Sequence, residues 1–338
     1  MPFREKIEIR QLDLELHGSC NLKCRMCPHV IGRERDFLKK LPWAVFEKII
    51  DDAMAYGVQS VSLHGSGEPT LNRDMPEMVR YIKDKGVACV AFTNGLKLDE
   101  ALIRRLIEAQ IDVLRVSAVG YDRASYHHWM GKDAFDLVRE NVRRFVHLNQ
   151  SLGGKSEVHL FHLLTQVEQT AQEIRWYREH WVEPTGALAE IWMMHNWSGG
   201  MKGPYDRKKM LGSPQRRSCG RSFSPLLQVR AGGLGSHHGA VVACSLILGR
   251  DSQGVLGHLD TQTIREVVSG EPYEKLHSAH RQKRFDDIPY CRDCDQLYDF
   301  SESLVWTNIP GRVYGESKVA KGVDHRKFVL TMESPSPP

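Results

Sequence analysis

Three cysteines near the start of the chain have a spacing that suits metal chemistry. Cys20, Cys24 and Cys27 follow the pattern C-x3-C-x2-C, with no fourth cysteine nearby. Three thiolates hold three corners of a cubic [4Fe–4S] cluster and leave one iron open to a ligand from outside the protein. A zinc site is the alternative, with His17 or His29 as the fourth ligand, but structural zinc sites usually pair their cysteines as C-x2-C. The spacing therefore favours a cluster with one open iron.

Four more cysteines lie further along the chain, at Cys219, Cys244, Cys291 and Cys294, with the spacing C-x24-C-x46-C-x2-C. Four thiolates in one region suit either a zinc ribbon or a fully ligated [4Fe–4S] cluster, and without further context zinc is the better interpretation. The eighth cysteine, Cys89, falls inside an expected strand, where a buried structural thiol is a better interpretation than a reactive one.

The composition is that of a folded protein with a slight positive charge. The 338 residues are 41% hydrophobic and 26% charged, and the net charge is +4. This length permits a large core, and the charge is too small to indicate nucleic-acid binding. The short basic stretches 207–209 and 281–284 are interpreted as solvated surface, and no apolar run approaches the roughly 20 residues that cross a bilayer. We therefore expect a cytoplasmic protein with no membrane or nucleic-acid partner, whose cysteines serve metal or redox chemistry.

The sequence patterns predict alternating strands and helices, and these elements position the cysteines. Period-two patterns predict six strands, and patterns with the helical period predict the helices between them. The strands are expected at residues 9–17, 58–63, 87–92, 112–116, 157–164 and 189–194, and the helices at 41–56, 74–86, 99–109, 134–149 and 168–181. Strands in such an alternation pair in parallel, and six units are too few to close an eight-stranded barrel. The predicted fold is therefore α/β, a partial (β/α)6 barrel.

The residues with unusual chemistry fall at one end of this predicted barrel. Reactive groups of such folds lie at the C-terminal ends of the strands. The segments found there are 20–27, 65–69, 93–95, Ser117 and 195–197. Because the strands are predicted from apolar periodicity and not from these residues, the agreement supports the predicted strands.

The pattern changes after about residue 200, where a polar, turn-rich stretch resembles a linker. Short strands at 226–229 and 241–243 and short helices at 264–268 and 273–280 are expected beyond it. We expect a barrel domain at 1–200, a smaller cysteine-containing domain at 201–317 and a flexible tail at 318–338.

The N-terminal part of the chain resembles the radical S-adenosylmethionine (radical SAM) enzymes through the runs CNLKCRMC, GSGEP and FTNG, within residues 9–200. The resemblance implies that Cys20, Cys24 and Cys27 hold a [4Fe–4S] cluster whose open iron chelates SAM. In that family an electron from the cluster cleaves SAM to methionine and a 5′-deoxyadenosyl radical, which abstracts a hydrogen atom from the substrate. The resemblance also implies a reductant such as flavodoxin or ferredoxin.

The same resemblance assigns residues to the SAM pocket. The family's Gly-Gly-Glu-Pro run binds the amino group of SAM, and it corresponds here to Ser66, Gly67, Glu68 and Pro69, with a serine in place of the first glycine. Glu68 and the carbonyl groups around it would suit an ammonium group.

Three further positions match the SAM pocket of the family. Asn94 and Ser117 line it at the ends of two strands, and Met26 stands where the family usually has an aromatic residue near adenine. The family's Ser-x-Asp pattern is here Ser117-Ala118-Val119, so no aspartate contact is expected.

The C-terminal region resembles the SPASM and twitch auxiliary-cluster domains, including the terminal CRDC run. A full SPASM domain has seven cysteines for two clusters, whereas the shorter twitch form has four. The resemblance therefore implies one auxiliary [4Fe–4S] cluster on Cys219, Cys244, Cys291 and Cys294. Because full ligation leaves no iron for substrate, it points to electron transfer.

A radical oxidoreductase acting on a small hydroxylated substrate, of the sugar or aminocyclitol type, is the leading hypothesis. The overall pattern resembles the twitch-containing type of aminocyclitol dehydrogenase from butirosin biosynthesis. His195 and Tyr298 are the candidate catalytic residues, because His195 ends the last barrel strand and a tyrosine is able to donate hydrogen. The alternatives are a radical epimerase with Tyr205 or Tyr298 as hydrogen donor, a peptide- or protein-modifying enzyme, and a zinc-binding scaffold without catalysis.

Overall fold

The computed structural model of the chain describes residues 7–27, 32–201, 216–298 and 304–310. His29, Tyr205, the basic stretch 207–209 and the predicted tail at 318–338 lie outside these residues. Within them no helix is both long and apolar enough to cross a bilayer.

Six parallel strands form the centre of the fold, as the sequence predicted. They are β1 (Gln11–Leu14), β2 (Ser60–Leu63), β3 (Ala88–Thr93), β4 (Val113–Ser117), β5 (Glu157–Leu164) and β6 (Leu188–Met193). Each pairs in parallel with the next along the chain. The sheet has two separate edges and does not close on itself. The prediction of an α/β fold built on a partial barrel is confirmed.

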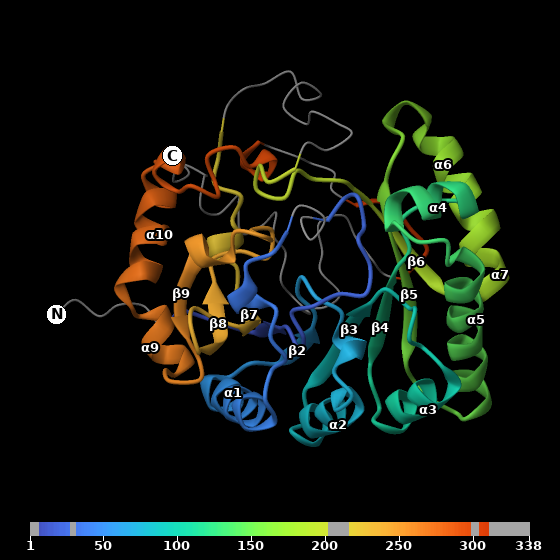
Figure 1. Cartoon of the computed structure of the whole chain (residues 1–338), viewed down its shortest axis with the longest axis horizontal. Helices are drawn as coiled ribbons and strands as arrows, with labels where there is room; N and C mark the ends of the chain where they lie inside the picture. Colours follow the sequence, from blue (N-terminus) through green and yellow to red (C-terminus); the bar gives the residue numbers. More distant parts are fainter. Residues whose placement is uncertain (1–6, 28–31, 202–215, 299–303, 311–338) are drawn as a thin grey trace, which may run out of the picture.

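The helices between these strands cover the outer side of the sheet (Figure 1). They are α1 (Trp43–Tyr56), α2 (Met75–Asp84), α3 (Glu100–Glu108), α4 (Arg123–Met130), α5 (Phe135–Ser151), α6 (Thr170–Tyr177) and α7 (Glu183–Thr185). A π-helical turn, Arg178–Val182, joins α6 to α7, so the single helix predicted at 168–181 is interrupted. In α1, α2, α3 and α5 the buried residues are mostly apolar and follow the helical period, so one stripe of each of these helices is buried.

Helix capping explains where two of these helices begin. The Asp99 side chain accepts a hydrogen bond from the Leu102 amide, which fixes the start of α3 as predicted. Asp74 precedes α2 but makes no such bond, and its carboxylate pairs instead with Lys40 at 2.6 Å. The helix α4 was not predicted from the sequence, although Asp122 and Ser125 form a capping box at its start.

The C-terminal region extends the same sheet. β7 (Leu226–Gly232) pairs in parallel with β1, and β8 (His238–Val242) and β9 (Val255–His258) follow in antiparallel order. β10 (Leu304–Thr307) pairs antiparallel with β6 at the other edge. The helices α9 (Ile264–Val268) and α10 (Glu271–Arg281) pack beside these strands. The sheet therefore has ten strands in the order β10-β6-β5-β4-β3-β2-β1-β7-β8-β9, and it crosses the predicted domain boundary near residue 200.

Short 3-10 turns complete the connections. They are η2 (Arg35–Phe37), η3 (Pro69–Leu71), η4 (Val167–Gln169), η6 (Arg221–Phe223), η7 (Asp251–Gly254), η8 (Phe285–Asp287) and η9 (Asp295–Leu297). η3 and η7 belong to loops near the cysteine sites, η6 begins two residues after Cys219, and η9 directly follows Cys294.

The inner side of the sheet carries polar and aromatic side chains. The guanidinium of Arg115 on β4 lies 4.6 Å from the ring centre of Phe92 and 5.4 Å from that of Phe161, and it pairs with Glu190 on β6. His64, just after β2, packs against Phe92 in a tilted arrangement with ring centres 4.7 Å apart. A parallel strand buried on both sides usually has apolar residues on each face, so a buried ion pair between β4 and β6 is an unusual feature of this sheet.

Candidate functional site

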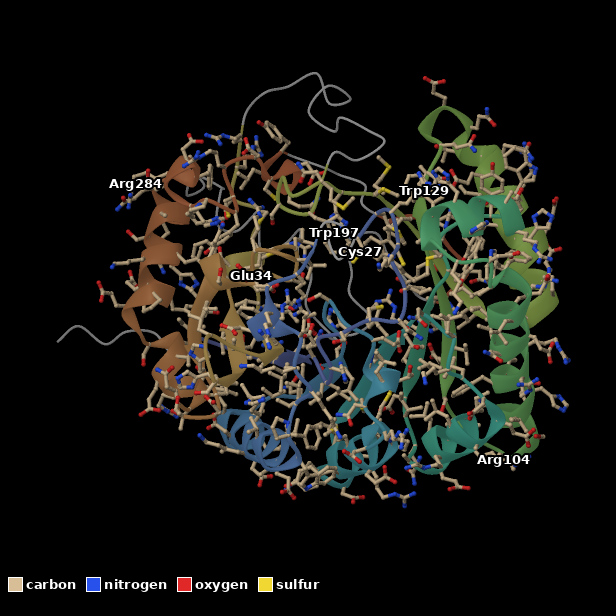
Figure 2. All side chains as sticks on the ribbon, in the orientation of Figure 1. Cys27, Glu34, Arg104, Trp129, Trp197 and Arg284 are labelled. Atoms are coloured by element: carbon tan, nitrogen blue, oxygen red, sulfur yellow. The ribbon has the colours of Figure 1, made fainter. Side chains whose placement is uncertain are left out.

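The first three cysteines lie on one loop after β1. The Cys27 amide donates to the Cys24 carbonyl at 3.0 Å, which turns the chain so that the thiols converge. Burial, followed by repulsion from Cys27 and Cys20, holds the pKa of the Cys24 thiol well above its ordinary value. Thiolates gathered in this way repel one another unless a cation joins them, so this donor set fits iron. Figure 2 shows Cys27 among the central loops of the view, whereas Arg104 and Arg284 lie at its outer edge.

The loop after β2 packs directly on the cysteine loop. The Glu68 amide donates to the Ser19 carbonyl at 2.9 Å. A Cβ atom on Gly67 would lie 1.7 Å from the His17 carbonyl oxygen, and one on Gly65 would lie 2.3 Å from a Glu15 carboxylate oxygen. Only glycine fits at these two positions, which explains the Gly-Ser-Gly run by close contact rather than by an unusual backbone angle.

The Glu68 carboxylate is occupied by the protein itself. Its Oε1 accepts from the Thr70 amide, the Thr70 hydroxyl and the Thr93 hydroxyl, and its Oε2 accepts from the Asn94 amide. A carboxylate has about four acceptor positions, so this side chain has little capacity left for an ammonium group. In the structure the Glu68 carboxylate joins the loops after β2 and β3, and binding of the SAM amino group by Glu68 and the carbonyls around it stays a prediction.

Asn94 is brought next to the cysteine loop. Its side-chain amide donates to Asn21 at 2.7 Å and lies 3.8 Å from the Cys20 sulfur. The remaining predicted SAM-pocket positions lie on the same loops or strand ends: Met26 is buried at 8% exposure, Ser66 and Pro69 are buried on the β2 loop, and Ser117 ends β4. Their contact with SAM remains a prediction.

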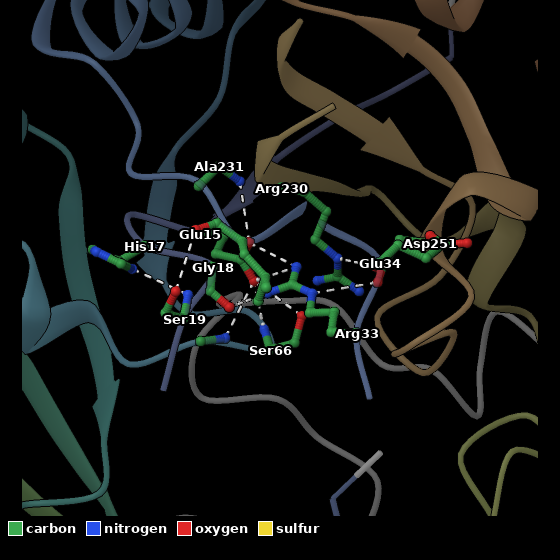
Figure 3. A network of polar contacts seen from close by, with 12 residues as sticks. Glu15, His17, Gly18, Ser19, Arg33, Glu34, Ser66, Arg230, Ala231 and Asp251 are labelled. Atoms are coloured by element: carbon green, nitrogen blue, oxygen red, sulfur yellow. Dashed lines mark hydrogen bonds and ion pairs between the residues drawn. The ribbon is translucent and has the colours of Figure 1, made fainter. Parts of the chain in front are cut away.

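Glu15 was not identified from the sequence, and it organises the whole site (Figure 3). It is fully buried just after β1, where it pairs with Arg33 at 2.9 Å and accepts from the Ser66 amide at 2.7 Å and the Ala231 amide at 3.2 Å. Burial alone would raise the pKa of this carboxyl, but Arg33 and Arg230 outweigh it and lower the pKa to about 2. Glu15 therefore stays ionised and holds the loops after β1 and β2 and strand β7 together.

The same network continues into the C-terminal region. Asp251 of η7 lies 2.7 Å from Nε of Arg230 and 3.5 Å from Nε of Arg33. Glu34 accepts from the Ser252 amide at 2.8 Å. Because the Asp251 carboxylate and both guanidinium groups are almost completely buried, they fix the position of the cysteine loop relative to the second cysteine set.

The second set converges as predicted. Cys219, Cys244, Cys291 and Cys294 all line one cavity, from the segment before η6, the loop after β8 and the turn before η9. Burial and the neighbouring Cys244 thiol raise the pKa of Cys219 to about 11. Four thiols that line one cavity are a donor set that fits a fully ligated [4Fe–4S] cluster.

A loop from the last barrel strand reaches this cavity. The Asn196 amide donates to Asp295 at 2.9 Å, and Ser198 lines the cavity. Trp197 and Ser198 both have positive φ, 49° and 56°, a strained conformation for residues with side chains. A segment between the barrel end and the second cysteine set is therefore held in place by specific bonds.

His195 precedes this strained pair. Its Nδ1 accepts from the Trp197 amide at 3.2 Å, and its ring packs against that of Trp197 with centres 4.3 Å apart. Tyr298 pairs with Arg216 in an isolated β-bridge beyond η9. These contacts are structural, and a catalytic role for either residue stays a prediction. Cys89 is fully buried in β3, and burial raises the pKa of its thiol far above the ordinary value.

His64 was also missed, although it directly precedes the Gly-Ser-Gly run and so stands at a strand end. Its Nδ1 lies 3.0 Å from the Ser62 hydroxyl and its Nε2 lies 3.7 Å from Asp13. Burial lowers the pKa of His64, although Asp13 opposes the shift, so the imidazole is neutral near pH 7. Its side chain keeps 23% exposure.

Two family models match the chain. The model described as "Radical SAM superfamily" matches residues 14–172, and the SPASM model, described as "Iron-sulfur cluster-binding domain", matches residues 236–295. The first includes the three-cysteine loop and the strand ends β1 to β5, and the second includes three of the four other cysteines.

Relatives and solved structures agree with these matches. A probable GTP 3′,8-cyclase of Saccharolobus islandicus (strain Y.N.15.51 / Yellowstone #2) is 30% identical over 234 residues, which is 54% of this chain and 74% of the relative. BtrN, solved in complex with AdoMet and 2-DOIA, has a TM-score of 0.57 and 15% identity over 88% of this chain and 98% of its own. Streptococcus suis SuiB bound to the precursor peptide SuiA has a TM-score of 0.63 and 15% identity over 86% and 70%. These two structures are similar in fold.

Proposed function

Because the chain belongs to the radical SAM superfamily, and so is a radical SAM enzyme that uses a [4Fe–4S] cluster, SAM and an auxiliary iron–sulfur centre, we propose that it oxidises an alcohol carbon of a small hydroxylated substrate to a ketone. The observation that supports this most directly is the cavity lined by all four C-terminal cysteines. Four protein ligands leave no open iron for a substrate, which makes electron acceptance the natural role of that centre.

The proposed oxidation balances in three parts. When bound, SAM and its cluster supply a 5′-deoxyadenosyl radical, which takes one hydrogen atom from the carbon that bears the hydroxyl. The hydroxyl proton must then pass to a base, and the remaining electron must pass to an acceptor. The substrate loses one hydrogen atom, one proton and one electron, and its C–O bond becomes a carbonyl.

The residues of the first loop would hold the reactants. We assign Cys20, Cys24 and Cys27 as ligands of the cluster whose fourth iron binds SAM. The backbone carbonyls of the Gly65–Gly67 run face the same loop and would accept from the SAM amino group, because charge-assisted bonds to an ammonium are strong. Glu15 and Glu68 position that run.

His64 is the described residue best placed to take the proton. Its imidazole is neutral near pH 7, is partly exposed and directly precedes the Gly-Ser-Gly run. Nδ1–H would donate to the Ser62 hydroxyl, which leaves Nε2 as the acceptor. The Asp13 carboxylate at 3.7 Å would stabilise the imidazolium that forms. His195 and Tyr298 remain further candidates, and Tyr298 would be the hydrogen donor if the reaction were an epimerisation.

Two contacts connect the loop after β6 to the proposed acceptor. Asn196 bonds to Asp295, next to Cys294, and Ser198 lines the four-cysteine cavity. The substrate site and the acceptor would therefore be joined by one short, rigid segment, which suits direct electron transfer.

Nucleotide cyclisation is the second candidate, because several relatives at 28–30% identity are probable GTP 3′,8-cyclases. The buried arginines Arg33, Arg115 and Arg230 are each paired with a carboxylate. A triphosphate attracts several unpaired cations, so the pairing of these three arginines favours a hydroxylated substrate without phosphate groups over GTP.

The test is anaerobic incubation of reconstituted protein with SAM, a reductant such as reduced flavodoxin, and each member of a panel of aminocyclitols, sugars and GTP. Formation of 5′-deoxyadenosine reports hydrogen abstraction, and mass spectrometry reports a product two mass units lighter than the substrate. Substrate deuterated at the reacting carbon should transfer one deuterium to 5′-deoxyadenosine.

The alternatives give different products. Incorporation of solvent deuterium into a product of unchanged connectivity would favour an epimerase, and cyclisation of GTP would favour the second candidate. Binding of a precursor peptide would favour a peptide-modifying enzyme. A colourless protein rich in zinc would contradict the proposal altogether.

A further inference from the structure

We propose that His280 is a positioning residue that donates a hydrogen bond to the Cys291 sulfur and thereby raises the reduction potential of the auxiliary cluster. This inference rests on the proposed function, because it concerns the centre assigned there as the electron acceptor. It adds a residue on α10 that no sequence pattern singled out.

The contact itself is specific. Nε2 of His280 lies 3.6 Å from the Cys291 sulfur, and His280 lines the four-cysteine cavity. The residue is buried at 3% exposure. Its ring is fixed by Phe285, with ring centres 5.3 Å apart, and by Phe223 at 6.1 Å. The imidazole therefore has little freedom to turn away from the sulfur.

The hydrogen-bond partners also determine which nitrogen carries the proton. The Ser218 hydroxyl lies 3.0 Å from Nδ1 of His280, and the Ser218 oxygen accepts from the Gly220 amide at 3.3 Å. A sulfur bound to iron has no proton to give, so Nε2 must be the donor in that contact. Nδ1 is then an acceptor, and the Ser218 hydroxyl donates to it. The series of hydrogen bonds from the Gly220 amide through Ser218 and His280 to the Cys291 sulfur therefore has one donor and one acceptor at each step.

The direction of the effect follows from charge. Reduction adds negative charge to the cluster and its sulfur ligands, so a hydrogen bond to a ligand sulfur stabilises the reduced form more than the oxidised form. A backbone donor acts in the same way at another ligand, because the Leu246 amide lies 3.4 Å from the Cys244 sulfur. A higher potential makes the cluster a better acceptor of the electron that alcohol oxidation releases.

The test is a potentiometric titration of the reconstituted two-cluster protein, followed by electron paramagnetic resonance. Added SAM alters the signal of the cluster with the open iron and so separates the two signals. His280→Phe keeps an aromatic ring but removes the donor. We expect the redox equilibrium of the auxiliary cluster to shift about tenfold toward the oxidised form. For a one-electron couple this lowers the reduction potential by about 59 mV. His280→Gln keeps a donor at a similar reach and should recover most of the difference.

Two further variants separate this role from general packing. His277→Phe changes an equally buried histidine on the same helix that bonds to the Ser222 carbonyl at 2.6 Å, and it should leave the potential unchanged. Ser218→Ala removes the group that sets the imidazole tautomer, and it should lower the potential by less than His280→Phe does.

An unchanged or higher potential in His280→Phe with full iron content would overturn the inference. Loss of the auxiliary cluster in both His280→Phe and His280→Gln would also overturn it, because His280 would then hold the iron. If only His280→Phe loses the cluster, the inference is tested by the Ser218→Ala variant. An unchanged reduction potential in Ser218→Ala would then contradict the inference. A wild-type protein with a single cluster would instead contradict the proposed function, whatever these variants do.

Discussion

Replacing Glu15 with glutamine should destabilise the protein and loosen the proposed SAM loop at the same time. Glu15 is 1% exposed, pairs with Arg33 and accepts from the Ser66 and Ala231 amides. A glutamine side chain has the same shape, but its NH2 group would face donors where an oxygen is needed. The substitution therefore removes charge and hydrogen-bond acceptance without removing volume.

The magnitude follows from the pKa of this group. The pKa is lowered from an ordinary 4.5 to about 2, and at 1.36 kcal/mol per pKa unit this corresponds to about 3 kcal/mol of folding free energy. Removing one partner of a buried ion pair costs about 3–5 kcal/mol in other proteins, which agrees. For a chain of this size we expect the melting temperature to fall by roughly 6 °C or more.

The pH dependence has a definite sign. Because the folded pKa lies below the ordinary value, the Glu15 contribution is complete above about pH 5 and is lost only as the pH falls toward 2. The difference in melting temperature between wild type and Glu15→Gln should therefore be the same at pH 6 and pH 8.

The assay is thermal unfolding of the anaerobically reconstituted protein, followed by circular dichroism. Glu100→Gln is the matched control, because it breaks an exposed ion pair with Arg104, and it should cost about 0.5 kcal/mol or less. Glu15→Gln should also slow 5′-deoxyadenosine formation by roughly tenfold to a hundredfold, since the Ser66 backbone loses its anchor. A melting temperature within about 1 °C of the Glu100→Gln variant would refute the reasoning.

Three more results are expected. His64→Gln should keep 5′-deoxyadenosine formation near the wild-type rate but reduce ketone formation by about 10²–10⁴-fold, and ketone formation at the wild-type rate would remove His64 as the base. Iron analysis should find that Cys27→Ala and Cys294→Ala each retain about half of the wild-type iron, and that only Cys27→Ala abolishes SAM cleavage; equal loss of cleavage in both would contradict the separate roles. Cys89→Ala should leave product formation unchanged and cost about 1 kcal/mol or less in stability, and loss of product would point to an epimerase that uses this thiol.

Much of the fold was determined by the sequence alone, because it rests on local patterns. The alternating strand and helix periods predicted β1 to β6 in their observed order, and the helix at α9 was predicted with its observed bounds. The cysteine spacing and the runs at the strand ends were enough to indicate where the site lies. These features depend on neighbours within a few residues, where period and spacing carry the information.

The tertiary structure decided how distant segments meet. Glu15 bonds to Ala231, and Arg33 lies near Asp251, across more than 200 residues of chain. The pairing of β7 with β1 and the saturation of the Glu68 carboxylate arise in the same way. No local pattern specifies the partner of a buried charge. A charged side chain needs a partner only when folding removes it from water, and that partner comes from a distant segment that is buried with it. The cysteines indicated a site, and long-range packing determined what surrounds it.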